Sequence, residues 1–177
     1  MKIISYVVRR DFGFAPNPFF DYCTLATCKP DIRKSAVIGD WVIGTSSKST
    51  GSSNKLVFAM KVTDKLTFDE YWRDERFVMK KPVLEHSRKF QYGDNIYHQE
   101  NNDWFQLPSH HSNIDGSINH LNVTTDTKVD CVLISNHFYY FGENAVLIPK
   151  NLRNIIKSGP GHKYVSRNLH YDFLNNF

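Results

Sequence analysis

The chain has 177 residues, of which 41% are hydrophobic and 14% aromatic, with a formal net charge of +4 at pH 7. This apolar content excludes a chain that is disordered throughout. The length predicts a single domain over residues 1–177. The small basic excess is compatible with a polyanionic partner, but it is no more than many solvated surfaces carry.

The cysteines indicate a reducing environment. Cys23, Cys28 and Cys131 are odd in number and form no Cys-x-x-Cys pair, which argues against a disulfide scaffold or a zinc ribbon. The apolar start of the chain meets Arg9-Arg10 too soon for a signal peptide, and no apolar run approaches the roughly 20 residues that span a bilayer. We therefore expect a cytoplasmic protein without membrane contact.

The first half of the chain reads as short strands separated by turns. Two prolines two residues apart exclude a helix in the aromatic loop Asp11–Pro18, whereas Pro30 suits a helix start. Gly39-Asp40 predicts a turn, because glycine accepts a positive φ and aspartate bonds nearby backbone. The predicted elements are strands at 3–9, 22–27, 41–45 and 55–63 and a helix at 30–35.

The second half begins with a helix signal. Thr67-Phe68-Asp69-Glu70 fits a capping box, in which Thr67 and Glu70 each bond the other's backbone N–H. Residues 82–117 are polar, rich in histidine and aromatic residues, and irregular. The predicted elements that follow are strands at 129–135, 137–141 and 145–148 and helices at 151–157 and 166–177. Short helices among these strands predict an α+β fold with a mixed barrel, not a doubly wound parallel sheet.

Several polar residues lie on irregular backbone and are candidates for a nucleotide site. The Gly93-Asp94-Asn95 turn offers donors and acceptors to a base edge, with Tyr97 close by for stacking. Basic side chains supply contacts to phosphate. The candidates, which we expect to converge on one concavity, are Asp11, Asn17, Lys29, Arg33, Asp94, Asn95, Tyr97, His162 and Lys163. The alternative is that these residues only form turns and core.

An enzyme is the alternative function. Its nucleophile would be Cys23 or Cys28, and Cys28 lies near the predicted helix start, where a thiolate is favoured. A buried, inert cysteine is the competing interpretation. The acid–base candidates are Asp11, Asp40, Asp94, His98, His110 and His162.

The histidines do not predict a metal site. Four of the eight, His98, His110, His111 and His120, lie at 98–120, but their spacing matches no known zinc pattern. We therefore expect no metal and no cofactor.

A set of longer motifs spans nearly the whole chain. They include Tyr6–Phe19, Cys23–Arg33 followed by Gly39-Asp40-Trp41, Leu56–Val62, Thr67–Trp72, Arg76-Phe77, Lys81-Pro82, Gly93–Tyr97, Val132–Ser135, Tyr140–Gly142 and Gly161–Lys163. In these motifs the chain resembles the second type of nucleotide-modification-associated domain. Its order of helix, Gly-Asp turn and strands is more loosely similar to PUA-like folds, including the ASCH and EVE groups.

The resemblance implies a PUA-like mixed β-barrel with short helices and a C-terminal helical segment. It also implies a domain that binds a nucleotide or nucleic acid, including one with a modified base, in phage or bacterial DNA-modification or defence systems. The alternatives are an enzyme that transfers or hydrolyses a group on a nucleotide or nucleobase, and an accessory protein that acts by protein contact. The resemblance supplies no established catalytic residues. Neither oligomeric state nor ligand identity follows from it.

Overall fold

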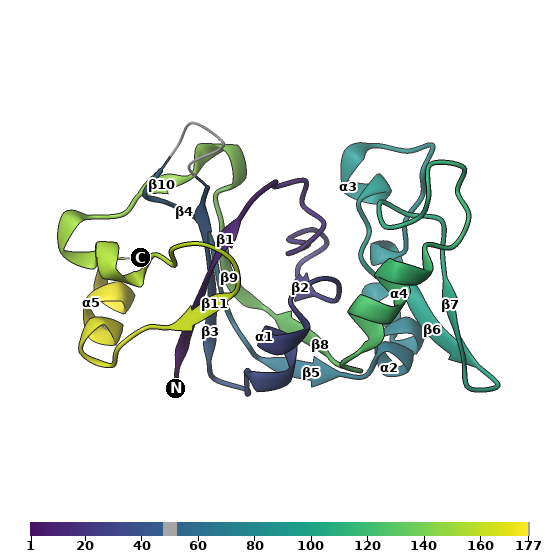
Figure 1. Ribbon diagram of the computed structural model, residues 1–177, viewed down its shortest axis with the longest axis horizontal. Coiled ribbons are helices and arrows are strands. Elements are labelled where there is room, and N and C mark those ends of the chain that lie inside the picture. Colours follow the sequence, from purple (N-terminus) through teal and green to yellow (C-terminus); the bar gives the residue numbers. More distant parts are fainter. Residues whose placement is uncertain (48–52, 177) are drawn as a thin grey trace. The chain divides into compact units, whose positions relative to one another are not determined.

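The computed structural model describes residues 1–47 and 53–176 and has an α+β fold of short helices and three sheets (Figure 1). The chain divides into two compact units. Unit 1 comprises Met1–Asp11, Ala36–Thr63 and His137–Phe177, and unit 2 comprises Phe12–Ser35 and Asp64–Asn136. Each unit has its own hydrophobic core. The single domain over residues 1–177 stays a prediction.

Unit 1 is built on the largest sheet, whose strand order is β10-β4-β3-β1-β11, with β9 also paired to β4. The strands are β1 (Ile3–Val8), β3 (Trp41–Ser46), β4 (Lys55–Lys61), β9 (His137–Tyr140), β10 (Val146–Leu147) and β11 (His162–Tyr164). The β1–β3 pair is parallel and the other pairs are antiparallel.

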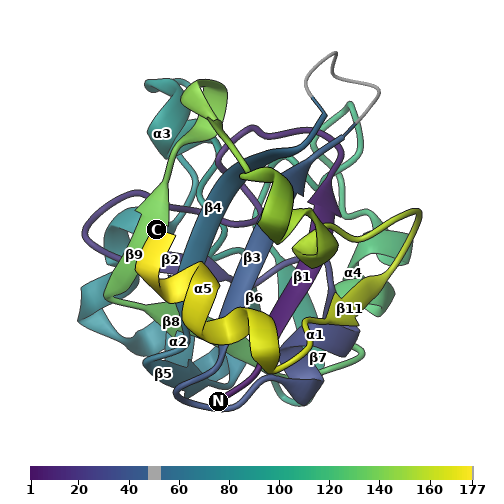
Figure 2. The same cartoon turned by 90° about the vertical axis from the view of Figure 1, so that its left-hand side faces the viewer.

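The core of unit 1 lies between this sheet and the C-terminal helix. Trp41 and Ile43 of β3 are buried and pack with Phe173 of α5 (Asn168–Asn176). Figure 2 shows α5 crossing the face of the sheet. Two 3-10 helices, η3 (Gly142–Asn144) and η4 (Lys150–Ile155), complete the unit.

The Gly39-Asp40 turn forms as predicted and leads directly into β3. Gly39 has a φ of +92° and donates its N–H to the carbonyl of Val62 at 2.8 Å. The buried carboxylate of Asp40 accepts bonds from the backbone N–H groups of Lys2 at 2.6 Å and Val37 at 3.1 Å. Asp40 therefore fixes the backbone of this turn.

Unit 2 contains two small sheets and most of the helices. Its strands are β2 (Cys23–Leu25), β5 (Asp64–Leu66) and β8 (Val132–Ser135) in one sheet, and β6 (Tyr97–Glu100) and β7 (Asp103–Gln106) in a hairpin. Its helices are α1 (Pro30–Ser35), α2 (Phe68–Arg73), η2 (Glu75–Lys80), α3 (Arg88–Gln91) and α4 (His120–Thr127).

The predicted capping box forms at the start of α2. Thr67 accepts the N–H of Glu70 at 3.2 Å, and the carboxylate of Glu70 accepts the N–H of Thr67 at 2.7 Å. Phe68 and Tyr71 then enter the core of unit 2, together with Phe77 and Ile134. This helix is thus specified both by its cap and by its apolar face.

The structure confirms an α+β fold and corrects parts of the expected arrangement. Among residues 1–47 and 53–176 we find no closed barrel. The strands expected at 3–9, 41–45 and 55–63 lie in the large sheet of unit 1, whereas the strand expected at 129–135 is β8, in the three-stranded sheet of unit 2. The helix expected at 151–157 is the 3-10 helix η4, and the described part of the chain includes no helix long and apolar enough to cross a membrane.

The segment expected to be irregular, 82–117, contains α3 and the β6–β7 hairpin. The hairpin turns through Asn101 and Asn102, which have φ values of +52° and +68°. Asparagine tolerates this left-handed conformation, so an Asn-Asn pair is a hairpin signal. Helix α4, which follows, was also missed because its polar sequence shows no apolar period.

Candidate functional site

The candidate site is centred on a strained turn in unit 2, between β2 and α1. Cys28 and Lys29 have φ values of +57° and +43°, which non-glycine residues rarely adopt. Two such residues in succession cost free energy, and strain of this kind is concentrated at functional sites. Cys28 is half-buried, and its turn places the thiol beside His111 and the backbone N–H beside Asp126, two side chains from distant segments of unit 2.

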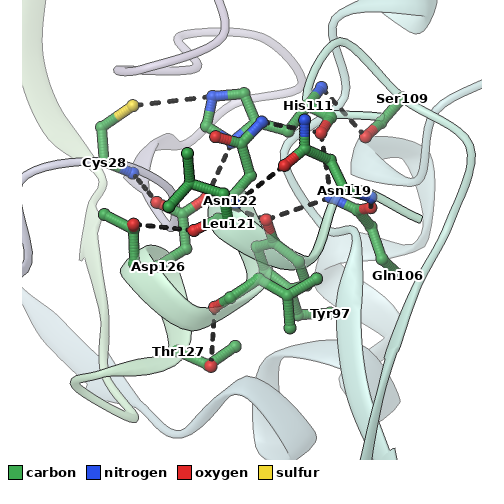
Figure 3. A network of polar contacts seen from close by, with 12 residues as sticks. Cys28, Tyr97, Gln106, Ser109, His111, Asn119, Leu121, Asn122, Asp126 and Thr127 are labelled. Carbon is green, nitrogen blue, oxygen red and sulfur yellow. Dashed lines mark hydrogen bonds and ion pairs between the residues drawn. The ribbon is translucent and has the colours of Figure 1, made fainter. Parts of the chain in front are cut away.

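Cys28, His111 and Asp126 form a Cys-His-Asp arrangement (Figure 3). The Cys28 sulfur lies 3.7 Å from Nε2 of His111, and Nδ1 of the same ring lies 2.7 Å from Oδ2 of Asp126. The imidazole therefore bridges a thiol and a carboxylate through its two nitrogens. This is the geometry of a nucleophile, a base and the group that orients the base.

Hydrogen bonds from several groups hold the carboxylate of Asp126 in place. It lies on α4, and its side chain is almost fully buried. Oδ1 accepts the backbone N–H of Cys28 at 2.7 Å, and Oδ2 accepts the hydroxyl of Tyr97 at 2.9 Å. Gln106 in turn donates to the Tyr97 oxygen at 3.2 Å. Asp126 thus fixes both the backbone of the nucleophile and the ring of the base.

Arg33 stabilises the same site through hydrogen bonds to the backbone. Its guanidinium is fully buried and donates to four backbone carbonyls, which belong to Cys28 at 2.9 Å, Val129 at 2.8 Å, Cys131 at 2.6 Å and Asp126. Burial lowers the pKa of Arg33, although nearby Asp126 opposes that shift. One side chain therefore ties the backbones of Cys28 and Asp126 together.

The surroundings of His111 shift the pKa of its imidazole. Burial lowers the pKa of His111, but the hydrogen bonds to Asp126 and Cys28 outweigh burial and raise that pKa to about 9. Burial and the Asp126 charge raise the pKa of Tyr97, so its hydroxyl stays a hydrogen-bond donor. At neutral pH the protonated form of His111 prevails, beside the sulfur of Cys28.

Aromatic rings surround the neighbouring histidine. Phe14 contacts both His111 and His110, at ring-centroid distances of 4.7 and 5.3 Å. The ring of His110 also contacts Phe12 and Tyr92 at centroid distances of 5.0 and 5.1 Å, and those two rings stack on each other at 5.4 Å. Burial and the charge of His111 lower the pKa of His110. Two adjacent histidines therefore have pKa values shifted in opposite directions.

The donor set does not resemble a metal centre. Within residues 1–47 and 53–176 there is no group of three or more His, Cys, Asp or Glu side chains arranged to hold an ion. The three cysteines, all in the described part of the chain, form no disulfide. The chemistry available at Cys28 is therefore that of a thiol with an adjacent imidazole.

Two of the residues predicted for a ligand site, Asn17 and Asp94, lie in a buried polar cluster of unit 2. Lys80 donates to the Asn17 carbonyl and side-chain oxygens at 3.1 and 2.7 Å. The carboxylate of Asp94 accepts from Thr24 and Tyr71, both at 2.7 Å. Burial raises the pKa of Asp94 and lowers that of Lys80, to about 8.

The other candidates are divided between the units. Asn95 is buried and donates to the carbonyls of Tyr71 and Phe77 at 3.0 and 3.3 Å. Arg33, Tyr97 and Lys29 lie at or beside the Cys28 turn. Asp11, His162 and Lys163 belong to unit 1, where Asp11 accepts the hydroxyl of Tyr140 and Lys163 donates to the Asn154 carbonyl. Binding of a ligand by these nine residues stays a prediction.

The structure also corrects one local expectation. The segment His162–Tyr164 is a strand, β11, paired antiparallel with β1, and not the irregular backbone predicted for His162 and Lys163 from the sequence. His111 and Asp126 were missed as partners of Cys28: His111 was considered only as a metal ligand, and nothing in the sequence marks Asp126. The neighbouring pair His110-His111 in a polar segment was the one available signal.

A comparison with protein-family models gives one match. The model described as "Nucleotide modification associated domain 2" matches residues 1–177, the whole chain. The same comparisons find no match among curated proteins or among solved structures.

Proposed function

This chain belongs to the nucleotide modification associated domain 2 family, and we propose that it is an enzyme that acts on a nucleotide or nucleobase through a covalent bond to Cys28. The observation that carries the proposal is the bridging position of His111, 3.7 Å from the Cys28 sulfur and 2.7 Å from Asp126. A core cysteine needs neither a base nor an oriented carboxylate.

The positions of Cys28, His111 and Asp126 indicate the role of each in the reaction. The imidazolium of His111 pairs with the Cys28 sulfur, which attacks an electrophilic atom of the substrate as the thiolate. Asp126 holds the ring in the tautomer whose Nε2 faces the sulfur and stabilises the imidazolium that forms. When the covalent intermediate breaks down, His111 returns the proton to the departing group or accepts one from water, so the thiol is regenerated. Group transfer and hydrolysis differ only in the second nucleophile.

Three further features support a reactive rather than a structural cysteine. The left-handed φ values of Cys28 and Lys29 hold the thiol in a conformation that a free chain avoids. Arg33 joins the backbones of the nucleophile and the orienting carboxylate. The thiol remains half-buried, so it is not sealed in the core. The first two features fix the site before substrate arrives, as catalysis requires, and the third leaves the thiol partly exposed.

The proposal also covers the substrate and the biological system in which the protein works. The substrate is a nucleotide or a nucleic acid, including one with a modified base, and the protein works in the cytoplasm in a phage or bacterial DNA-modification or defence system. A PUA-like relationship of the fold is part of the same hypothesis. The family name supports the theme of nucleotide modification.

Thiol reactivity tests the proposal directly. Iodoacetamide should alkylate Cys28 at least about tenfold faster than Cys131, because the protonated imidazole of His111 stabilises the reactive thiolate of Cys28. Cys131 is a matched control, since it too is half-buried, and burial raises its pKa. Mass spectrometry of tryptic peptides identifies the labelled residue and its rate. His111→Gln should slow the labelling of Cys28 and leave that of Cys131 unchanged.

Incubation with nucleotide and oligonucleotide mixtures completes the test. Wild type should release a chemically changed nucleotide, or carry a covalent adduct, and Cys28→Ala should do neither. If Cys28 reacts no faster than Cys131 and the Cys28→Ala variant still changes the nucleotide, Cys28 is not the nucleophile. Binding of an unchanged nucleotide with an unreactive Cys28 would favour a binding domain instead.

A further inference from the structure

His110 lies next to His111, and the proposed mechanism gives it no role. Its ring rests against Phe12, Phe14 and Tyr92, with ring-centroid distances of 5.0 to 5.3 Å. Its centroid lies 6.2 Å from that of His111. Because burial and the charge of His111 lower its pKa, His110 is a neutral imidazole at neutral pH. A neutral imidazole can both donate and accept a proton.

A neutral histidine next to a Cys–His pair suits a reaction with two separate proton movements. His111 is engaged with the thiol on one side and Asp126 on the other. A second proton transfer, at a different substrate atom, therefore needs another group within a few ångströms. Pairs of titratable groups whose pKa values are shifted apart commonly divide acid and base roles in this way.

Among the nucleobases, pyrimidines present a chemical target for this arrangement. Their C5=C6 double bond is conjugated with the group at C4, so a thiolate can add to C6 without a leaving group. The adduct then exchanges a proton at the adjacent atom, C5. We propose that the substrate of Cys28 is a pyrimidine nucleotide, free or within DNA, that the sulfur adds to C6 of the base, and that His110 transfers the proton at C5. This inference rests on the proposed role of Cys28.

The step balances without a co-reactant. The sulfur lone pair forms the S–C6 bond, and the C5=C6 electron pair moves toward C4 and its oxygen or nitrogen. His110 relays a proton from water to C5, which gives a saturated C5–C6 bond. In reverse, His110 removes either hydrogen from C5, the double bond re-forms, and the thiolate departs. The net result is exchange of the C5 hydrogen with water, and the same adduct activates C5 toward an electrophile.

Hydrogen exchange in deuterated water tests the inference. The probes are dUMP, dCMP and single-stranded oligonucleotides containing dU or dC, and proton NMR follows the loss of the C5 hydrogen. Wild type should exchange it, and Cys28→Ala should not. His110→Phe, which keeps an aromatic ring against Phe12, should exchange about a hundredfold more slowly while its Cys28 alkylates at the wild-type rate. His86→Phe is the matched control, an exposed histidine packed on Phe90 at 4.3 Å.

The possible results distinguish failure of the pyrimidine assignment from failure of the proposed function of Cys28. Exchange with the mononucleotides identifies a free nucleotide, and exchange with oligonucleotides alone identifies a base in nucleic acid; both support the inference. Rapid alkylation of Cys28 with no exchange from any probe overturns the pyrimidine assignment and leaves the proposed function standing. Exchange that persists in His110→Phe removes His110 from the reaction. An unreactive Cys28 without exchange overturns both proposals.

Discussion

Replacement of Arg33 by methionine should destabilise the protein by about 4 kcal/mol. Methionine keeps most of the buried volume but removes donors to the carbonyls of Cys28, Val129, Cys131 and Asp126. Hydrogen bonds to a charged group contribute about 1.5–3 kcal/mol each. The full sum is not expected, because the variant also avoids the cost of burying the guanidinium, whose lowered pKa reflects that cost.

Urea unfolding followed by circular dichroism measures this effect, which corresponds to a roughly thousandfold change in the folded-to-unfolded ratio. Arg73→Met is the matched control: Arg73 has a side chain that is 72% exposed and an ion pair to Asp69 at 3.5 Å. Its loss should cost less than about 1 kcal/mol. Arg33→Met should also slow the alkylation of Cys28, because the same guanidinium positions the backbones of Cys28 and Asp126.

A free energy of unfolding for Arg33→Met within about 1 kcal/mol of wild type, the size of an ordinary surface change, would refute this role of Arg33. If that variant were stable and instead lost affinity for nucleotides, with a weaker salt dependence, the phosphate contact expected from the sequence would be the correct role of Arg33.

Three further predictions concern stability. The pKa of His111 is raised in the folded state to about 9 from its usual 6.5, so the stabilisation that His111 provides should be complete below pH 6.5 and fade as the pH rises through 9. The difference between the urea midpoints of wild type and His111→Gln should follow that window. Lys80 has the opposite sign, since burial lowers its folded pKa to about 8 from 10.5, so wild type should gain stability relative to Lys80→Met between pH 8 and 10.5. Burial also lowers the pKa of Lys81, which is only half-buried, so Lys81→Met should give a smaller difference of the same sign. Gly93→Ala should cost more than about 2 kcal/mol, because the added Cβ would stand 2.3 Å from the Lys80 carbonyl oxygen; thermal unfolding would show no change in Tm if that contact could relax.

Local signals in the sequence identified much of the secondary structure. The capping box at Thr67 and the turn at Gly39 depend on residues within a few positions of each other, so the sequence contains all that they require. The strands around Trp41 and Leu56 followed from their apolar residues, which bury in any sheet that covers them. The hairpin at Asn101 had a usable signal that the polar composition of its segment obscured.

The candidate site depended on contacts between distant segments. The sequence marked Cys28 and Arg33 as chemically interesting, but the partner of Cys28 is 83 residues away and that of His111 is a further 15. No local pattern encodes such a meeting, because it arises only when the polar helix α4 packs beside the turn at Cys28. Burial also decided roles that residue type could not. Asp94 and Asn95 looked like ligand groups on a turn, and the tertiary structure buries both, where the Asp94 carboxylate and the side-chain NH2 of Asn95 bond to other parts of the core.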